Sequence, residues 1–338
     1  MILVTGGTGL VGAHLLLKLT ENEVSVRAIY RKIDTIKKTK ALFRMYQKEA
    51  FFFKIEWIQA DIIEVPSLEI AFKNIDYVYH CAGLLSYNPA DESKLRKTNI
   101  EGTANIVNFC LHYNVKKLCH VSSIAALGDI DPNEKQITET TEWNAEIPHS
   151  DYAISKYGAE MEIWRGQREG LNVVIVNPGV IFGAGFLNQG SGLFFSEVKK
   201  GFHFYTNGST GYVGVTDVVK IMIQLMKSEI VGERFTVVAE NLSFKEVIFS
   251  IAENLKVSKP TFEAKPWILS IAWRIDCLVS FLFRTKRKLS KHSANSLHSS
   301  DFISNEKIKN PETSGLNYEF QSMDSVIKEV IAMQKATP

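Results

Sequence analysis

The chain has 338 residues, of which 45% are apolar and 22% are charged, and its formal net charge is +2. This length and apolar share allow a sizeable core and exclude bulk disorder, and the balance of 39 basic and 37 acidic residues does not favour a nucleic-acid partner. The apolar pattern begins at Ile2, so we expect no signal peptide. The four cysteines lack CxxC or Cys/His spacing, so we expect reduced thiols, no metal site and a cytoplasmic protein.

Short β-rich runs alternate with helical patterns through the first two-thirds of the chain. The expected strands are Ile2–Thr5, Val24–Tyr30, Ile55–Gln59, Tyr77–Ala82, Lys117–Ser122 and Val173–Asn177. The expected helices are Val11–Leu19, Lys37–Glu49, Leu68–Phe72, Ser93–His112 and Asp151–Arg168. This alternation predicts right-handed βαβ units, and hence an α/β fold with a doubly wound parallel (Rossmann) sheet.

Beyond Asn177 the pattern loosens into glycine- and aromatic-rich loops between short helices, among them Val218–Lys227 and Phe244–Leu255. We expect a Rossmann domain over residues 1–178 that also receives a later strand and helix from 212–240. Residues 179–338 should form mainly a smaller, irregular substrate-binding region with C-terminal helices. Open α/β folds bind ligands at the carboxyl ends of their strands, so this region should pack there.

Four glycines follow the first expected strand in the run MILVTGGTGLVG, and their spacing fits both GxGxxG and GxxGxxG. Such a turn lets backbone N–H groups at a helix N-terminus approach a diphosphate. A tight strand–helix turn without a ligand is the alternative, but the position at the first βα junction favours binding. The expected dinucleotide-binding residues are Gly6, Gly9, Leu10, Val11 and Gly12.

Two cations end the second expected strand, where an acidic residue would accept the ribose 2′-OH of NAD. Arg31 and Lys32 suit a 2′-phosphate instead, so NADP(H) is favoured and NAD(H) is the alternative. Asp34 heads a helical segment and is expected to be its N-cap. Asp61, after the third strand, is a candidate acceptor for the adenine amino group, or else caps the following turn.

A phenol and an ammonium lie four residues apart in Tyr152-Ala-Ile-Ser-Lys156, and therefore on one face of a helix. A cation near a phenol favours the phenolate and lowers the pKa of the phenol toward the operating range. Ser122 and Ser123 end another expected strand, at the carboxyl edge of the sheet. A hydroxyl there could hold a substrate oxygen while Tyr152 gives or takes the proton.

The order of the motifs resembles the extended short-chain dehydrogenase/reductases, the NAD(P)-dependent epimerase/dehydratase superfamily. The resemblance extends from residue 1 to about 255. It is carried by TGGTGLVG, Asp61-Ile62, HCAG (80–83), Asn99-Ile-Glu-Gly-Thr103, SSIAALG (122–128), YAISK (152–156), NPGVIFG (177–183) and YVGVTDVV (212–219).

This resemblance implies roles for individual residues. Tyr152 would be the catalytic acid/base, Lys156 would bind the nicotinamide ribose and lower the pKa of Tyr152, and Ser123 rather than Ser122 would orient the substrate oxygen. Asn99 is at the position of a helix-distorting asparagine, with a structural kink or a proton relay as its role. Further cofactor contacts would come from Ile62, Cys81, Ala82, Gly83, Pro178 and Val180.

Three branches of the superfamily compete. Dehydratases carry an acidic pair after the serine position, where this chain has Ile124 and Ala125. Epimerases usually have an acidic NAD determinant, where this chain has Arg31 and Lys32. The pattern is closest to dihydroflavonol reductase and 3β-hydroxysteroid dehydrogenase-like members, which implies ketone or secondary-alcohol chemistry on an apolar small molecule. An NAD-dependent nucleotide-sugar epimerase is the alternative, and a non-catalytic dinucleotide-binding regulator the third hypothesis.

The residues expected to contact the substrate are apolar. Leu84, Leu85 and Tyr87 follow the fourth strand, and Phe182 and Phe186 would line the far wall, although any one of these aromatic side chains could belong to the core.

The apolar run 266–283 is short of the roughly 20 residues of a spanning helix, and it contains Arg274 and Asp276. We expect a buried or lid-forming helix. Peripheral membrane contact through 266–288, aided by Arg284, Lys286, Arg287 and Lys288, is the alternative. By analogy with relatives, the helical segments 93–112 and 151–168 would pair in a homodimer.

Overall fold

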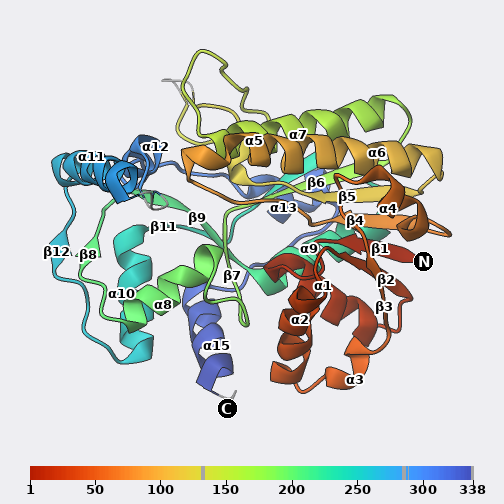
Figure 1. Ribbon diagram of the computed structural model, residues 1–338, viewed down its shortest axis with the longest axis horizontal. Helices are drawn as coiled ribbons and strands as arrows, with labels where there is room; N and C mark the ends of the chain where they lie inside the picture. Colours follow the sequence, from red (N-terminus) through yellow and green to blue (C-terminus); the bar gives the residue numbers. More distant parts are fainter. Residues whose placement is uncertain (131–133, 284–286, 288, 336–338) are drawn as a thin grey trace.

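The computed structural model describes residues 1–130, 134–283, 287 and 289–335. At its centre lies a seven-stranded sheet in the order β10-β6-β5-β4-β1-β2-β3 (Figure 1). Every pairing in it is parallel, which confirms the predicted Rossmann-type sheet. The strands are β1 (Ile2–Thr5), β2 (Val26–Tyr30), β3 (Ile55–Gln59), β4 (Tyr77–His80), β5 (Lys117–Val121), β6 (Val173–Pro178) and β10 (Glu233–Val237).

Helices cover both faces of this sheet. One layer contains α1 (Leu10–Glu21), α2 (Ile33–Met45), α3 (Glu49–Phe52) and α9 (Val215–Lys227), and the other contains α4 (Val65–Ala71), α6 (Gly102–His112) and α7 (Asp151–Arg168). Side chains of one strand alternate between the layers, so Val174 and Val176 face the first and Val173 and Ile175 the second. Every residue of β6 is buried, which explains its apolar run over 173–176.

The last strand of the sheet comes from late in the chain. Helix α9 returns the chain from the smaller region, and β10 then pairs with β6 from Glu233 opposite Val174 to Val237 opposite Pro178. The main sheet therefore combines residues from 2–178 with residues 233–237.

The smaller region surrounds a three-stranded sheet of β7 (Val180–Phe182), β9 (Ser209–Gly214) and β11 (Glu240–Ser243). Its core packs β7 and β9 against α8 (Leu193–Lys199), α10 (Phe244–Leu255) and α15 (Met323–Lys335). Two short strands, β8 (Phe204–Tyr205) and β12 (Phe262–Glu263), pair nearby. The remaining C-terminal helices are α11 (Pro266–Phe283), α12 (Lys291–Ser296), α13 (Glu306–Lys309) and α14 (Pro311–Ser314).

Three sequence-based expectations need correction. Helix α2 begins at Ile33 with Lys32 as its N-cap, so the prediction that Asp34 is the N-cap is wrong. Asp34 lies in the first turn, where the helix dipole favours an acidic side chain, and it pairs with Lys37 at 2.7 Å.

The helix expected over 93–112 is interrupted. It consists of α5 (Glu92–Leu95), a π-helical segment over Arg96–Glu101, and α6. Asn99 lies within the π-helical segment, as its helix-distorting position implied. The run 266–283 is expected to be a buried or lid-forming helix, and the buried alternative is wrong, because Ser280 is the only buried side chain between 266 and 280. The lid-forming alternative stays a prediction.

Candidate active site

The turn after β1 has the compact geometry that its glycines allow. Gly6 has φ +69°, and a Cβ there would lie 2.6 Å from the backbone of Cys81 and Ala82, which follow β4. A Cβ at Gly12 would lie 2.3 Å from the Gly6 carbonyl oxygen. The chain can therefore fold this tightly only with glycine at both positions.

Gly9 differs from Gly6 and Gly12, because the packing around it leaves room for a side chain. A Cβ at Gly9 would meet only the Gly6 carbonyl oxygen, at an ordinary 3.4 Å. Gly9 is the N-cap of α1, and as a glycine it has no side chain to cap the helix. The N–H groups of Leu10 and Val11, the first two residues of α1, therefore receive no hydrogen bond from an N-cap side chain. A small residue at an uncrowded helix N-terminus fits a diphosphate that approaches the backbone.

Arg31 and Lys32 follow β2 directly, and both are exposed. Neither side chain has an ion-pair partner within the described part of the chain. Their charges are thus available at the end of β2, where a dinucleotide places its adenosine ribose.

Asp61 fills one of its two expected roles in this structure, and the other stays a prediction. One carboxylate oxygen accepts a hydrogen bond from the Ile63 N–H at 3.3 Å and so caps the turn after β3. The other oxygen leaves an acceptor for an adenine amino group. Ile62 is buried and packs against Gly102, where a Cβ would lie 2.6 Å from Ile62 Cδ1.

Tyr152 and Ser123 meet at the carboxyl edge of the sheet. Ser150 caps α7 by accepting from the Ala153 N–H at 3.1 Å, which fixes the helix start directly before Tyr152. The Tyr152 phenol lies close to the Ser123 side chain. Ser122 is buried, so Ser123 presents the accessible hydroxyl of the pair.

Burial raises the pKa of Tyr152 above its usual value, and Tyr87 adds to the rise while the polar Ser123 side chain opposes it. The lowering expected from a nearby ammonium is therefore not the net direction in this structure, because desolvation of the phenolate outweighs the favourable contacts.

Lys156 lies one helical turn from Tyr152 and is 5% exposed. Its ammonium donates to the Val121 carbonyl oxygen at 2.8 Å. Burial lowers the pKa of Lys156 to about 8, although Glu160 and Cys81 oppose the shift. The ammonium thus stands at the end of β5, two residues before Ser123.

The chain after β4 borders the same site. A Cβ at Gly83 would lie 3.9 Å from Lys156 Nζ, which places Gly83 beside the ammonium. Asn99 holds this segment in place: its Oδ1 accepts from the Leu84 N–H at 2.7 Å, and its Nδ2 donates to the Leu84 carbonyl oxygen and to Ser155 Oγ, each at 2.9 Å. The π-helical segment therefore ties α7 to the loop beside Lys156.

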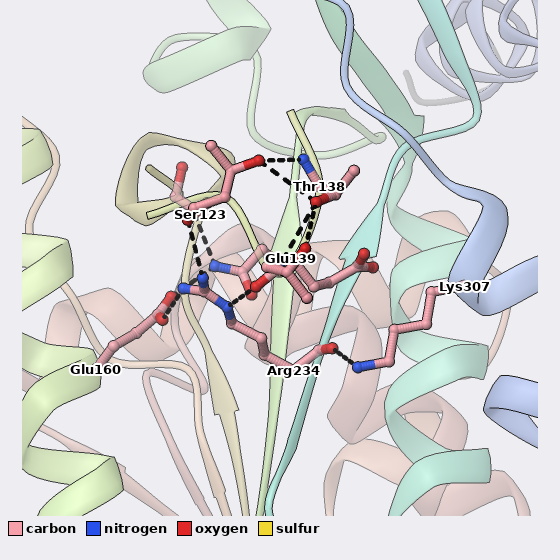
Figure 2. A network of polar contacts seen from close by, with 9 residues as sticks. Ser123, Thr138, Glu139, Glu160, Arg234 and Lys307 are labelled. Carbon is pink, nitrogen blue, oxygen red and sulfur yellow. Dashed lines mark hydrogen bonds and ion pairs between the residues drawn. The ribbon is translucent and has the colours of Figure 1, made fainter. Parts of the chain in front are cut away.

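A buried polar network behind Ser123 was missed from sequence (Figure 2). The Asn177 amide donates to the Ser123 carbonyl oxygen at 3.0 Å and to the Glu160 carboxylate at 2.5 Å. Arg234 of β10 donates to the same carboxylate at 3.2 Å and to the Glu139 carbonyl oxygen at 2.7 Å. Glu160 is i+4 from Lys156, so its place on the same face of α7 was the available signal.

The candidate substrate residues divide into two groups. Leu84 is half-buried, whereas Leu85 and Tyr87 are exposed, and the Tyr87 ring lies 6.1 Å from the Tyr152 ring. Phe182 packs on Phe195 and Tyr212 in the core of the smaller region.

Phe186 is likewise buried, in a cluster with Leu42 and Ala13, so neither phenylalanine presents an open wall in this structure. Pro178 ends β6 and Val180 begins β7, next to the strand edge that carries the site.

The sequence model of the NAD dependent epimerase/dehydratase family matches residues 2–237. Two similar relatives are sterol demethylase protein B of Methylococcus capsulatus, 26% identical with 88% of each chain covered, and a putative dihydroflavonol 4-reductase of Synechocystis, 25% identical with 80% of this chain and 77% of the relative covered. The crystal structure of UDP-glucose 4-epimerase from Thermotoga maritima with UDP-glucose aligns with a TM-score of 0.76 over 99% of each chain, at 20% identity.

The fold, the glycine turn and the Ser–Tyr–Lys arrangement agree with these similarities. Since the family model spans more than half of the residues, the chain belongs to the NAD dependent epimerase/dehydratase family and is an NAD(P)-dependent enzyme of the extended short-chain dehydrogenase/reductase superfamily.

Proposed function

We propose that the protein is an NADPH-dependent reductase that converts a ketone on an apolar substrate to a secondary alcohol, or catalyses the reverse oxidation. The observation that carries this proposal is the meeting of Tyr152, Ser123 and Lys156 at the carboxyl edge of the sheet. When bound, the cofactor supplies the hydride. The residues that would hold the cofactor are those of the turn 6–12 together with Arg31, Lys32, Asp61, Gly83, Lys156, Pro178 and Val180.

The three side chains divide the proton chemistry between them. Ser123 donates a hydrogen bond to the substrate oxygen, and Tyr152 gives that oxygen its proton as negative charge develops there. The raised pKa of Tyr152 keeps the phenol protonated at neutral pH, which suits a proton donor. Lys156, one turn away, stabilises the phenolate that remains and holds the nicotinamide ribose.

The apolar character of the substrate is inferred from the residues beside the site. The segment 84–87 after β4 brings the Tyr87 ring to 6.1 Å from the Tyr152 ring, and this segment contains Leu84 and Leu85 and no charged residue. Two relatives, a sterol demethylase protein and a putative dihydroflavonol 4-reductase, are named for multi-ring substrates, which supports a multi-ring or isoprenoid-like substrate.

A nucleotide-sugar epimerase is the second candidate. A UDP-glucose 4-epimerase of Vibrio cholerae is 25% identical over 273 residues, which keeps this activity in view. Arg31 and Lys32 at the end of β2 favour the reductase, because an acceptor for a free 2′-OH would be acidic.

The test measures NADPH consumption by the purified chain against a panel of apolar ketones, beside UDP-sugars. Net consumption with a ketone supports the reductase, whereas sugar conversion without consumption of added cofactor supports the epimerase. We expect Tyr152→Phe to lose turnover by at least about 100-fold while it binds NADPH normally. Tyr157→Phe on the same helix should act like the wild type, and cofactor binding without any turnover would favour a regulator.

The segments 93–112 and 151–168 are also proposed to pair with the same helices of a second copy. Met161 on α7 is 39% exposed and would lie in such an interface. Light scattering should give twice the chain mass for the wild type and a monomer for Met161→Glu. A monomeric wild type would contradict the pairing.

A further inference from the structure

Helix α11 turns an apolar face away from the rest of the protein. Trp267, Ile271, Ile275, Leu278 and Val279 are between 43% and 62% exposed. Their spacing of three and four residues puts them on one stripe along the helix. Isolated exposed apolar side chains are common on proteins, but a continuous stripe marks an interaction surface.

The only acidic residue of α11, Asp276, lies outside this stripe. Asp276 is half-buried, accepts from the Leu289 N–H at 3.2 Å and faces Arg287 at 4.0 Å. Arg274 lies at the edge of the stripe and folds back on its own helix, donating to the Ser270 carbonyl oxygen at 2.6 Å. The helix therefore presents an exposed apolar stripe that no carboxylate interrupts.

The sequence around the helix is positively charged. Residues 277–300 contain no aspartate or glutamate, and the eight residues 284–291 include five lysines and arginines. Lys265, just before the helix, is exposed as well. An outward apolar stripe combined with local positive charge fits a surface that presents both hydrocarbon and anionic headgroups.

We propose that α11 docks in the plane of an anionic lipid bilayer and attaches the protein peripherally to the membrane. Among the described residues, no helix is both long and apolar enough to cross a bilayer. The stripe would enter the boundary between headgroups and acyl chains, and the exposed Lys265 and Lys291 would contact the headgroups.

Helix α12 lies between the docking helix and the start of α7. Helix α11 packs on α12, as Figure 1 also shows. On α12, His292 is close enough to Asp151 for their charges to interact, and Asp151 precedes Tyr152 in α7. A docked protein would thus bring the Tyr152 end of α7 near the membrane, although docking itself does not depend on the proposed reaction.

The experiment is co-sedimentation of the full chain with vesicles of phosphatidylcholine alone or of phosphatidylcholine with phosphatidylserine. We expect binding to the anionic vesicles, weakened by salt, and a loss of at least about tenfold in Ile271→Ser/Ile275→Ser. The matched control is Phe53→Ser/Ile70→Ser, which removes two side chains that are 70% and 58% exposed elsewhere on the protein and should bind like the wild type. Thermal melts establish that both variants are folded.

Three outcomes would overturn the proposal. The first is a wild-type chain that does not sediment with anionic vesicles, and the second is an α11 variant that sediments as well as the wild type. The third is light scattering in which the α11 variant converts a dimer to a monomer without a change in vesicle binding, since the stripe would then contact a second copy. Soluble-ketone turnover, measured in parallel, tests the reductase separately.

Discussion

The ammonium of Lys156 donates a hydrogen bond to the carbonyl oxygen of Val121, the last residue of β5, at 2.8 Å. This contact ties α7 to the strand that leads into Ser123, so one side chain fixes the distance between the two elements that carry the candidate catalytic groups. The same ammonium is buried, and its charge is therefore sensitive to pH.

We expect turnover to decline as the pH rises through about 8, the value to which burial lowers the pKa of Lys156. A lysine with a lowered pKa is charged below that value and neutral above it, well before the usual 10.5. Turnover rates of the wild type measured from pH 6 to 10 should show this decline. The variant Lys156→Met should turn over slowly at every pH and show no decline near pH 8. A wild-type profile that stays flat to pH 10 would contradict this assignment.

Glu160 is expected to position Ser123 without touching the substrate. Glu160→Gln keeps an oxygen for Asn177 but removes the charge that pairs with Arg234, so we expect kcat to fall roughly tenfold with KM for the cofactor unchanged. Glu160→Ala should also cost about 3–5 kcal/mol of stability, because it leaves Arg234 without its buried partner.

The control is Glu162→Gln, which removes a surface pair with Arg165 on the same helix and should change neither quantity measurably. Steady-state kinetics and urea unfolding separate the two effects. An equal rise in KM for the cofactor and fall in kcat would indicate general damage to the site instead.

Two glycines of the first turn should respond oppositely to alanine. Gly12→Ala places a Cβ 2.3 Å from a backbone oxygen, so we expect a loss of about 1–3 kcal/mol or failure to fold. Gly9→Ala has room within the protein and should melt near the wild-type temperature. Its added methyl group should nevertheless weaken dinucleotide binding by about tenfold, measured by calorimetry. Unchanged affinity in Gly9→Ala would place the diphosphate elsewhere.

Cofactor preference should depend on Arg31 and Lys32. The double alanine variant is expected to raise the Kd for NADPH by at least about tenfold, since a charge-assisted hydrogen bond contributes about 1.5–3 kcal/mol. The Kd for NADH should change little. Lys73→Ala, another exposed lysine, serves as the control. Equal weakening for both cofactors would refute recognition of a 2′-phosphate.

The folded state should lose stability in acid partly through His14. Burial lowers the pKa of His14 to about 4, so between pH 6.5 and 4 the unfolded chain binds a proton that the folded chain does not. The free energy of unfolding should then fall by on the order of 3 kcal/mol across this window from His14 alone. His14→Gln should flatten that part of the curve in urea titrations, and an unchanged slope would rule His14 out.

Local signals were sufficient to predict several elements to the residue. The expected ranges Ile2–Thr5, Ile55–Gln59, Asp151–Arg168 and Phe244–Leu255 coincide with β1, β3, α7 and α10. Helix α7 begins at the Ser150 cap, and α10 begins at a capping box formed by Ser243 and Glu246. Start signals of this kind are written within four residues, so they can be read without knowledge of the fold.

The polar network behind Ser123 could not be read in this way. Glu160 and Arg234 are 74 residues apart, and they meet only because β10 joins the sheet beside β6. The direction of the Tyr152 pKa shift was missed for a related reason: spacing reveals the nearby lysine but not the extent of burial, which dominates the shift.

The late arrival of β10 has a consequence for biosynthesis. In the complete fold β6 is fully buried and pairs with β10 on one edge. Until residues 233–237 leave the ribosome, that edge of β6 has unpaired backbone groups, and its valines are not yet covered. Such an edge invites pairing with other nascent chains, and contacts between distant segments form slowly. Chaperone binding during translation should therefore peak when the chain has emerged past residue 178 and subside once residue 237 is free to add its strand.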